Sequence, residues 1–134
     1  MKSKGISVTP MGSALGADVT GVDLADLAEE QMESIRQALD AHLVLRFRGT
    51  ALSDQDFTRF AARFGDILPS PSYTRSRPVY IPDAPLVTVI SNVTEDGKPV
   101  GEHGDGELHW HTDLAFTETP SALTMLLARE VPPA

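Results

Sequence analysis

Short runs that alternate apolar and polar residues indicate strands in the first half of the chain. Residues 5–9 read Gly-Ile-Ser-Val-Thr, and residues 17–19 read Ala-Asp-Val. Successive side chains of an extended segment point to opposite faces, so each run can bury one face. Residues 43–47, Leu-Val-Leu-Arg-Phe, predict a third strand that ends at Gly49.

Two longer segments repeat apolar residues every three or four positions, which is typical of amphipathic helices. The first spans residues 28–42, and the second spans residues 54–64 with Ser53 as its N-cap and Gly65 as its stop. The predicted apolar stripe of the first helix, which continues one residue past its end, consists of Met32, Ile35, Leu39 and Leu43, and that of the second consists of Phe57, Phe60, Ala61 and Phe64.

Strand patterns and long loops dominate the second half. Residues 66–85 are rich in proline, which excludes a long helix and predicts an irregular connection of a kind that often carries function. Residues 86–90 and 122–128 predict strands, and Asp96-Gly97 can turn a hairpin. Helices in the first half and strands in the second predict an α+β fold, in which helices flank a mostly antiparallel sheet. So few strands leave exposed sheet edges, and we expect the chain to be the front part of a larger β-structure.

Composition narrows the classes of partner. A chain of 134 residues with 41% hydrophobic and 22% charged residues is ordinary for one globular domain. Eleven basic and nineteen acidic residues give a net charge of −8, which argues against a nucleic-acid groove or an anionic membrane surface. The sequence has no apolar run typical of a signal peptide or a membrane span, so we expect a cytoplasmic location. Cysteine is absent, so any metal must be held by histidine and carboxylate.

The segment Gly-Glu-Leu-His-Trp-His-Thr-Asp-Leu-Ala-Phe, residues 106–116, carries a candidate metal site. His111 and Asp113 are two positions apart, so in an extended segment their side chains leave the same face about 6–7 Å apart at Cα. His109 shares that face, but its Cα would lie about 13 Å from that of Asp113, which excludes one ion held by all three. One histidine and one carboxylate are two ligands of the 2-His-1-carboxylate triad that holds Fe(II) in oxygenases. Taken alone, such a pair is more often an ordinary surface pair, and Trp110 and Phe116 beside it are by default packing residues.

Residues 110–133 read Trp-His-Thr-Asp, followed by Phe116, a Thr-Pro and an apolar run. This run resembles a specific segment of the TauD/TfdA family of Fe(II)- and 2-oxoglutarate-dependent dioxygenases. Residues 6–25 resemble the family's opening, residues 39–49 its strand after the first helix, and residues 52–67 its second helix. The resemblance covers nearly the whole chain in family order and is weakest across residues 69–105.

The resemblance implies a fold, a reaction and a set of site residues. The family fold is a double-stranded β-helix, or jelly roll, with flanking helices, and we expect this chain to contain only part of it as the N-terminal portion of a single domain, residues 1–134. The implied cofactors are Fe(II), O₂ and 2-oxoglutarate as cosubstrate, and the implied partner is a small organic molecule that becomes hydroxylated. His111 and Asp113 match the first two iron ligands, and Leu114 and Phe116 match positions that face the substrate. Tyr73 is a further candidate for the substrate pocket, with loop packing as its alternative role.

Family members are about twice as long as this chain, and their further iron-binding histidine and 2-oxoglutarate-binding residues would lie beyond Ala134. We therefore expect the 134-residue chain alone to be inactive, and its sheet edges to favour self-association or pairing with a complementary C-terminal segment. Two alternatives remain open at this stage. One is a non-enzymatic, dioxygenase-like module that binds a partner. The other is a Zn(II) site formed by His109, His111 and a ligand from another molecule.

Overall fold

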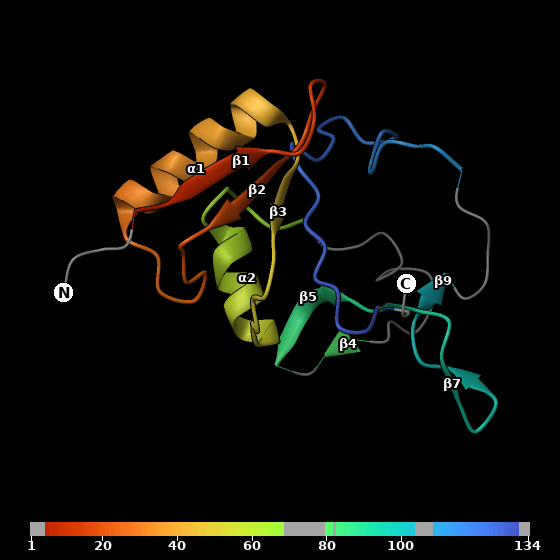
Figure 1. Ribbon diagram of the computed structural model, residues 1–134. Coiled ribbons are helices and arrows are strands. Elements are labelled where there is room, and N and C mark those ends of the chain that lie inside the picture. The colour runs from red at the N-terminus through yellow and green to blue at the C-terminus, as the bar shows by residue number, and fades with distance from the viewer. Residues whose placement is uncertain (1–4, 69–79, 82, 104–108, 132–134) are drawn as a thin grey trace. The chain divides into compact units, whose positions relative to one another are not determined.

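The computed structural model describes residues 5–68, 80–81, 83–103 and 109–131 (Figure 1). The chain divides into two compact units, residues 1–63 and 64–134. Both helices of the described residues belong to the first unit. Among the described residues no helix has the length and apolar character that crossing a membrane requires.

A three-stranded sheet forms one layer of the first unit. Its strands are β1 (Ser7–Pro10), β2 (Ala17–Thr20) and β3 (Leu45–Phe47), in that order, with β1 antiparallel to β2 and β2 parallel to β3. A parallel pair requires a crossover connection, and helix α1 (Glu29–His42) supplies it between β2 and β3 (Figure 1). All three predicted strands are present.

Helix α1 (Glu29–His42) buries one face against the sheet side of the unit. Met32 and Ile35 are fully buried and Ala38 nearly so. The prediction that Leu43 completes the apolar stripe is wrong, because Leu43 is the C-cap, with φ of 64°, and its side chain is 69% exposed. A left-handed residue turns the chain out of the helical spiral, so its side chain no longer follows the helix face.

Helix α2 (Asp54–Ala62) begins as predicted. The Ser53 hydroxyl accepts a hydrogen bond from the backbone N–H of Asp56 at 3.0 Å, which satisfies one of the free donors of the first turn. Phe60 is buried and meets Phe47 of β3 edge to face, with ring centroids 5.8 Å apart. The helix ends at Ala62 with Arg63 as C-cap, so the predicted stop at Gly65 lies too far along the chain.

Ion pairs at the surface of the first unit join elements that are distant in sequence. Arg46 donates two hydrogen bonds to the Asp18 carboxylate, at 2.6 Å and 2.8 Å, and so links β2 to β3. The hydrogen bond from Arg46 lowers the pKa of Asp18 below its ordinary value. Glu29, at the start of α1, accepts a hydrogen bond from Arg36 of the same helix and another from Arg63, the C-cap of α2. The bond from Arg63 ties α1 to the end of α2.

The described residues of the second unit form three two-stranded pairs. The strands are short, and one of these three pairs is parallel. The prediction of a hairpin at Asp96-Gly97 is confirmed, because these residues join β7 to β8 with φ of 51° and 73°. The strand predicted at residues 86–90 is divided at Val89 between β5 and β6. The pairs are β4 (Tyr80–Ile81) with β5 (Ala84–Thr88), β6 (Ile90–Ser91) with β9 (Glu102–His103), and β7 (Thr94–Glu95) with β8 (Lys98–Pro99).

The strand predicted at residues 122–128 does not form in the part of the chain that the structure describes. The segment keeps the alternation that suggested a strand, with Leu123, Met125 and Leu127 half-buried and the residues between them exposed. Alternation fixes which side chains share a face, but a strand also needs a neighbouring backbone to accept and donate its hydrogen bonds. The described residues therefore combine helices and strands, as an α+β fold requires, without a closed barrel.

Candidate metal centre

The residues around the predicted site form a turn in place of a continuous extended run. The turn begins at Asp113, and Leu114 is left-handed with φ of 53°. The Leu114 carbonyl accepts hydrogen bonds from the Thr117 backbone N–H at 3.0 Å and from the Thr117 hydroxyl at 2.7 Å. The chain thus changes direction immediately after Asp113. The two candidate ligands, His111 and Asp113, lie in the segment that leads into this turn.

The His111 imidazole and the Asp113 carboxylate lie together on one side of this segment. Nε2 of His111 is 3.1 Å from Oδ1 of Asp113, as the spacing of two positions leads one to expect. The two side chains are 58% and 44% exposed, so solvent and small molecules can reach both.

The backbone carbonyl of His109 determines which imidazole nitrogen faces Asp113. Nδ1 of His111 lies 2.7 Å from this oxygen, which can only accept a hydrogen bond, so Nδ1 carries the proton. In the neutral ring the Nε2 lone pair then points toward the Asp113 carboxylate. Two acceptor atoms this close need a proton or a cation between them, which makes the gap a candidate position for a metal. The His109 carbonyl, together with the negative charge of Asp113, raises the pKa of His111, so a metal at Nε2 would compete with a proton.

The distance between the two donor atoms fits a shared ion. Two ligands about 2.1 Å from an octahedral ion and at right angles to each other lie about 3 Å apart. The observed separation of 3.1 Å matches that value. An imidazole nitrogen with a carboxylate oxygen is also the donor set of the 2-His-1-carboxylate sites of Fe(II) oxygenases. The pair therefore fits two of the three protein ligands of such a site.

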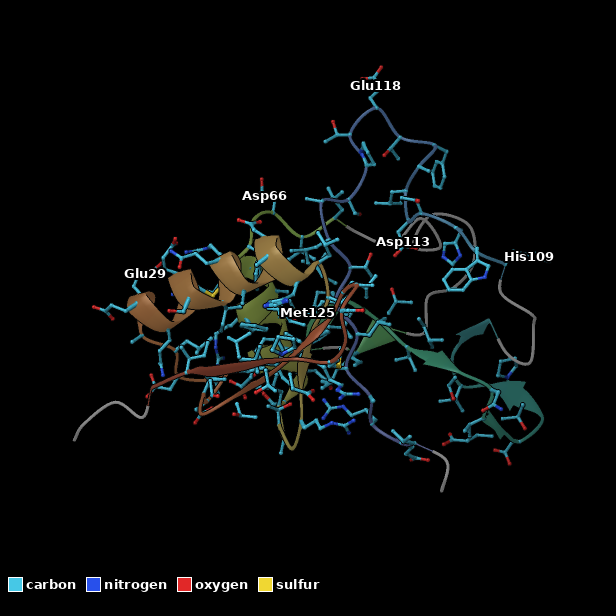
Figure 2. The ribbon with its side chains drawn as sticks, turned by 45° about the horizontal axis from the view of Figure 1, so that its top comes forward. Glu29, Asp66, His109, Asp113, Glu118 and Met125 are labelled. Atoms are coloured by element: carbon cyan, nitrogen blue, oxygen red, sulfur yellow. The ribbon has the colours of Figure 1, made fainter. Side chains whose placement is uncertain are left out.

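No third ligand joins the pair among the residues that the structure describes, where no group of three His, Asp or Glu side chains could hold a metal. His109 contributes its carbonyl, and Figure 2 shows its position well apart from Asp113. Glu118, the next carboxylate along the chain, projects away from Asp113 in the same view (Figure 2).

Thr124 contacts Asp113, and the sequence did not suggest this contact. The Thr124 hydroxyl donates a hydrogen bond of 2.5 Å to Oδ2 of Asp113 from eleven positions further along the chain. The sequence places Thr124 only within an apolar run, and nothing in the spacing of His111 and Asp113 points to it. The two oxygens of Asp113 therefore have different partners, the imidazole for Oδ1 and the threonine hydroxyl for Oδ2.

Two of the predicted substrate-facing residues, Leu114 and Phe116, are described by the structure and follow directly after the pair. Leu114 is half-buried, Phe116 is 78% exposed, and Trp110 is fully exposed, so the default prediction that Trp110 and Phe116 pack in a core is wrong for these described residues. Tyr73 lies outside the described residues. A shallow hollow of about 330 Å³ lies elsewhere, in the first unit, between residues 24–27 and α2.

His111 and Asp113 supply one imidazole and the carboxylate of the donor set that non-haem Fe(II) oxygenases use. Comparison with known proteins identifies the family: residues 7–134 match the family described as "Taurine catabolism dioxygenase TauD, TfdA family", and the chain belongs to it. The family resemblance read from the sequence is thus confirmed.

Two curated relatives illustrate the extent of the match. Pentalenolactone F synthase of Streptomyces avermitilis is 38% identical over 135 residues, which cover 98% of this chain and 43% of the relative. The alpha-ketoglutarate-dependent 2,4-dichlorophenoxyacetate dioxygenase of Cupriavidus pinatubonensis is 31% identical over 136 residues, 96% of this chain and 47% of the relative. The chain thus spans less than half the length of these relatives. The cosubstrate in the second name is the one that the sequence resemblance implied.

A solved structure agrees at the level of the fold. A taurine dioxygenase from Burkholderia xenovorans superposes with a TM-score of 0.53 at 26% identity, over 65% of this chain and 32% of that chain.

Proposed function

We propose that this chain is the N-terminal portion, residues 1–134, of an Fe(II)- and 2-oxoglutarate-dependent dioxygenase that hydroxylates a small organic molecule and yields succinate and CO₂. The observation that carries the proposal is the pair of donor atoms, His111 Nε2 and Asp113 Oδ1, 3.1 Å apart in a chain of this family. On the same proposal, the fold is an incomplete jelly roll in the cytoplasm, completed by a C-terminal segment or by self-association.

The roles of the residues follow from their chemistry. His111 offers a neutral nitrogen whose orientation is fixed by the His109 carbonyl, and Asp113 offers one negative charge toward the same point. When bound there, Fe(II) supplies the activation of O₂ that oxidises 2-oxoglutarate and the substrate. Leu114, Phe116 and Tyr73 are proposed to line the substrate side. Asp113 fills a coordination position with carboxylate, which favours hydroxylation over transfer of a halide bound in that position.

A metal titration tests the site without requiring turnover. Two protein ligands hold a metal weakly, so we expect Mn(II) to broaden the NMR signals of residues 109–114 only at high micromolar to millimolar concentration. His111→Ala and Asp113→Ala should each remove the effect, while His109→Ala, which keeps the backbone carbonyl, should retain it. Broadening that is lost in His109→Ala would favour the zinc alternative, and broadening that is unchanged in His111→Ala would refute the site.

A second measurement tests whether residues 1–134 alone supply enough ligands for turnover. We expect the 134-residue chain with Fe(II), ascorbate and 2-oxoglutarate to release no more CO₂ than its His111→Ala variant. Robust release by the chain alone would contradict the proposal that further ligands lie outside it. A stable monomer that takes up no metal would instead favour a binding module.

A further inference from the structure

The contact between Thr124 and Asp113 assigns a role to a residue that is not a metal ligand. We propose that Thr124 is a positioning residue, which holds the Asp113 carboxylate so that Oδ1 alone faces the metal beside His111. This inference rests on the proposed function, because it concerns the same site. Its basis is the hydrogen bond of 2.5 Å from Oγ1 of Thr124 to Oδ2 of Asp113.

The contact restricts a torsion that is otherwise free. The terminal torsion of an aspartate side chain has a broad distribution, so an unrestrained carboxylate can present either oxygen or both. Carboxylates bind metals through one oxygen or through two. A hydroxyl bond to Oδ2 occupies that oxygen and leaves Oδ1, 3.1 Å from the imidazole nitrogen, as the free donor. A single-oxygen ligand keeps one more coordination position open for cosubstrate, O₂ or substrate.

The bond joins a hydroxyl to a carboxylate and crosses between two segments. Hydrogen bonds to an ionised carboxylate are roughly twice as strong as neutral ones. Thr124 belongs to the apolar run 122–128 and Asp113 to the turn, so the bond links two segments that are separate in the sequence. The Thr117 hydroxyl, in contrast, bonds only to the carbonyls of Leu114 and Thr119, within the turn itself.

The exposure of Asp113 sets the size of the effect that the loss of Thr124 should have on metal affinity. The side chain of Asp113 is 44% exposed, so water competes with Thr124 for Oδ2. The loss of metal affinity on removing Thr124 should therefore lie at the low end of the range for residues that hydrogen-bond to a metal ligand. Loss of an outer partner of a metal ligand typically weakens metal affinity about 10- to 100-fold. We therefore expect a change of about tenfold here.

The test compares three threonine variants of the chain by Mn(II) titration. Thr124→Val keeps the shape of the side chain and removes the hydroxyl, and should raise the Kd for Mn(II) about tenfold. Thr124→Ser keeps the hydroxyl and should restore affinity to within about threefold of the unmodified chain. Thr119→Val is the matched control, since Thr119 is an exposed threonine of the same segment that offers its carbonyl to Thr117, and should leave the Kd unchanged.

Two further measurements separate positioning from a general structural effect. Thr124 is exposed, so Thr124→Val should leave the thermal unfolding midpoint unchanged. In the metal-free chain, the carboxyl ¹³C signal of Asp113 should shift in Thr124→Val and return in Thr124→Ser. With Co(II), the visible spectrum of Thr124→Val should change in the direction of a higher coordination number as the carboxylate binds through both oxygens.

The outcomes distinguish this inference from the proposed function. Equal Mn(II) affinity of Thr124→Val and the unmodified chain, with loss of binding in His111→Ala, would overturn the role of Thr124 and leave the metal site standing. Absence of Mn(II) binding by the unmodified chain would refute the metal site and this inference together. An affinity loss in Thr124→Val accompanied by an equal loss in Thr119→Val or by a lowered unfolding midpoint would also overturn the positioning role.

Discussion

The packing of α1 predicts different stability losses for two residues that the sequence pattern alone treats as equivalent. Ile35 and Leu43 belong to the same apolar stripe in the sequence, but Ile35 is fully buried and Leu43 is 69% exposed. Replacing each with alanine removes apolar atoms of about the same volume from two different environments. The Ile35→Ala variant should therefore lose much more stability than the Leu43→Ala variant.

The expected magnitudes follow from burial. Removing most of a buried isoleucine loses about 1.5–3 kcal/mol of transfer free energy, and the cavity that remains adds to this loss. The side chain of Ile35 is fully buried, so we expect a loss of about 3 kcal/mol. Leu43→Ala keeps the same left-handed backbone and removes mostly solvated atoms, so its cost should stay below about 0.5 kcal/mol.

Urea unfolding followed by far-ultraviolet circular dichroism is the suitable assay. Both helices of the described residues lie in the first unit, so the helical signal reports its unfolding. The single tryptophan, Trp110, lies in the second unit and is fully exposed, so its fluorescence would respond little. Equal losses in the two variants would refute the packing described for α1, and a large loss in Leu43→Ala alone would refute the left-handed cap as well.

Two further predictions concern the cap of α2 and the ion pair of the sheet. Ser53→Ala should destabilise the first unit by about 1 kcal/mol in urea unfolding because the N–H of Asp56 loses its acceptor, and Ser53→Asp should restore most of this loss. Asp18→Asn should lower the unfolding midpoint at neutral pH, because the bond from Arg46 favours the ionised carboxylate in the folded chain. The folded pKa of Asp18 lies below its ordinary value of 3.8, so this contribution is present above that value and is lost as pH falls through the folded pKa. The midpoints of Asp18→Asn and the unmodified chain should therefore converge in acid, and a difference that persists there would contradict the assigned role of the Arg46 pair.

The sequence alone determined the elements whose signals are local. The periodicity around Met32 and Ile35 located α1, Ser53 located the start of α2, and Asp96-Gly97 located a hairpin. Each of these signals depends on residues a few positions apart, which interact in the same way in any fold. The two-residue spacing of His111 and Asp113 likewise predicted that their side chains meet, and the family motif around them predicted the chemistry.

Tertiary structure decided the features that depend on distant parts of the chain. The left-handed C-cap turned Leu43 out of the apolar stripe, and the run 122–128 formed no strand because a strand needs a backbone partner as well as an alternating pattern. The contact from Thr124 to Asp113 depends on how a turn and a later segment meet. No spacing rule links residues eleven positions apart in irregular segments, so only the folded chain could bring this hydroxyl to the carboxylate.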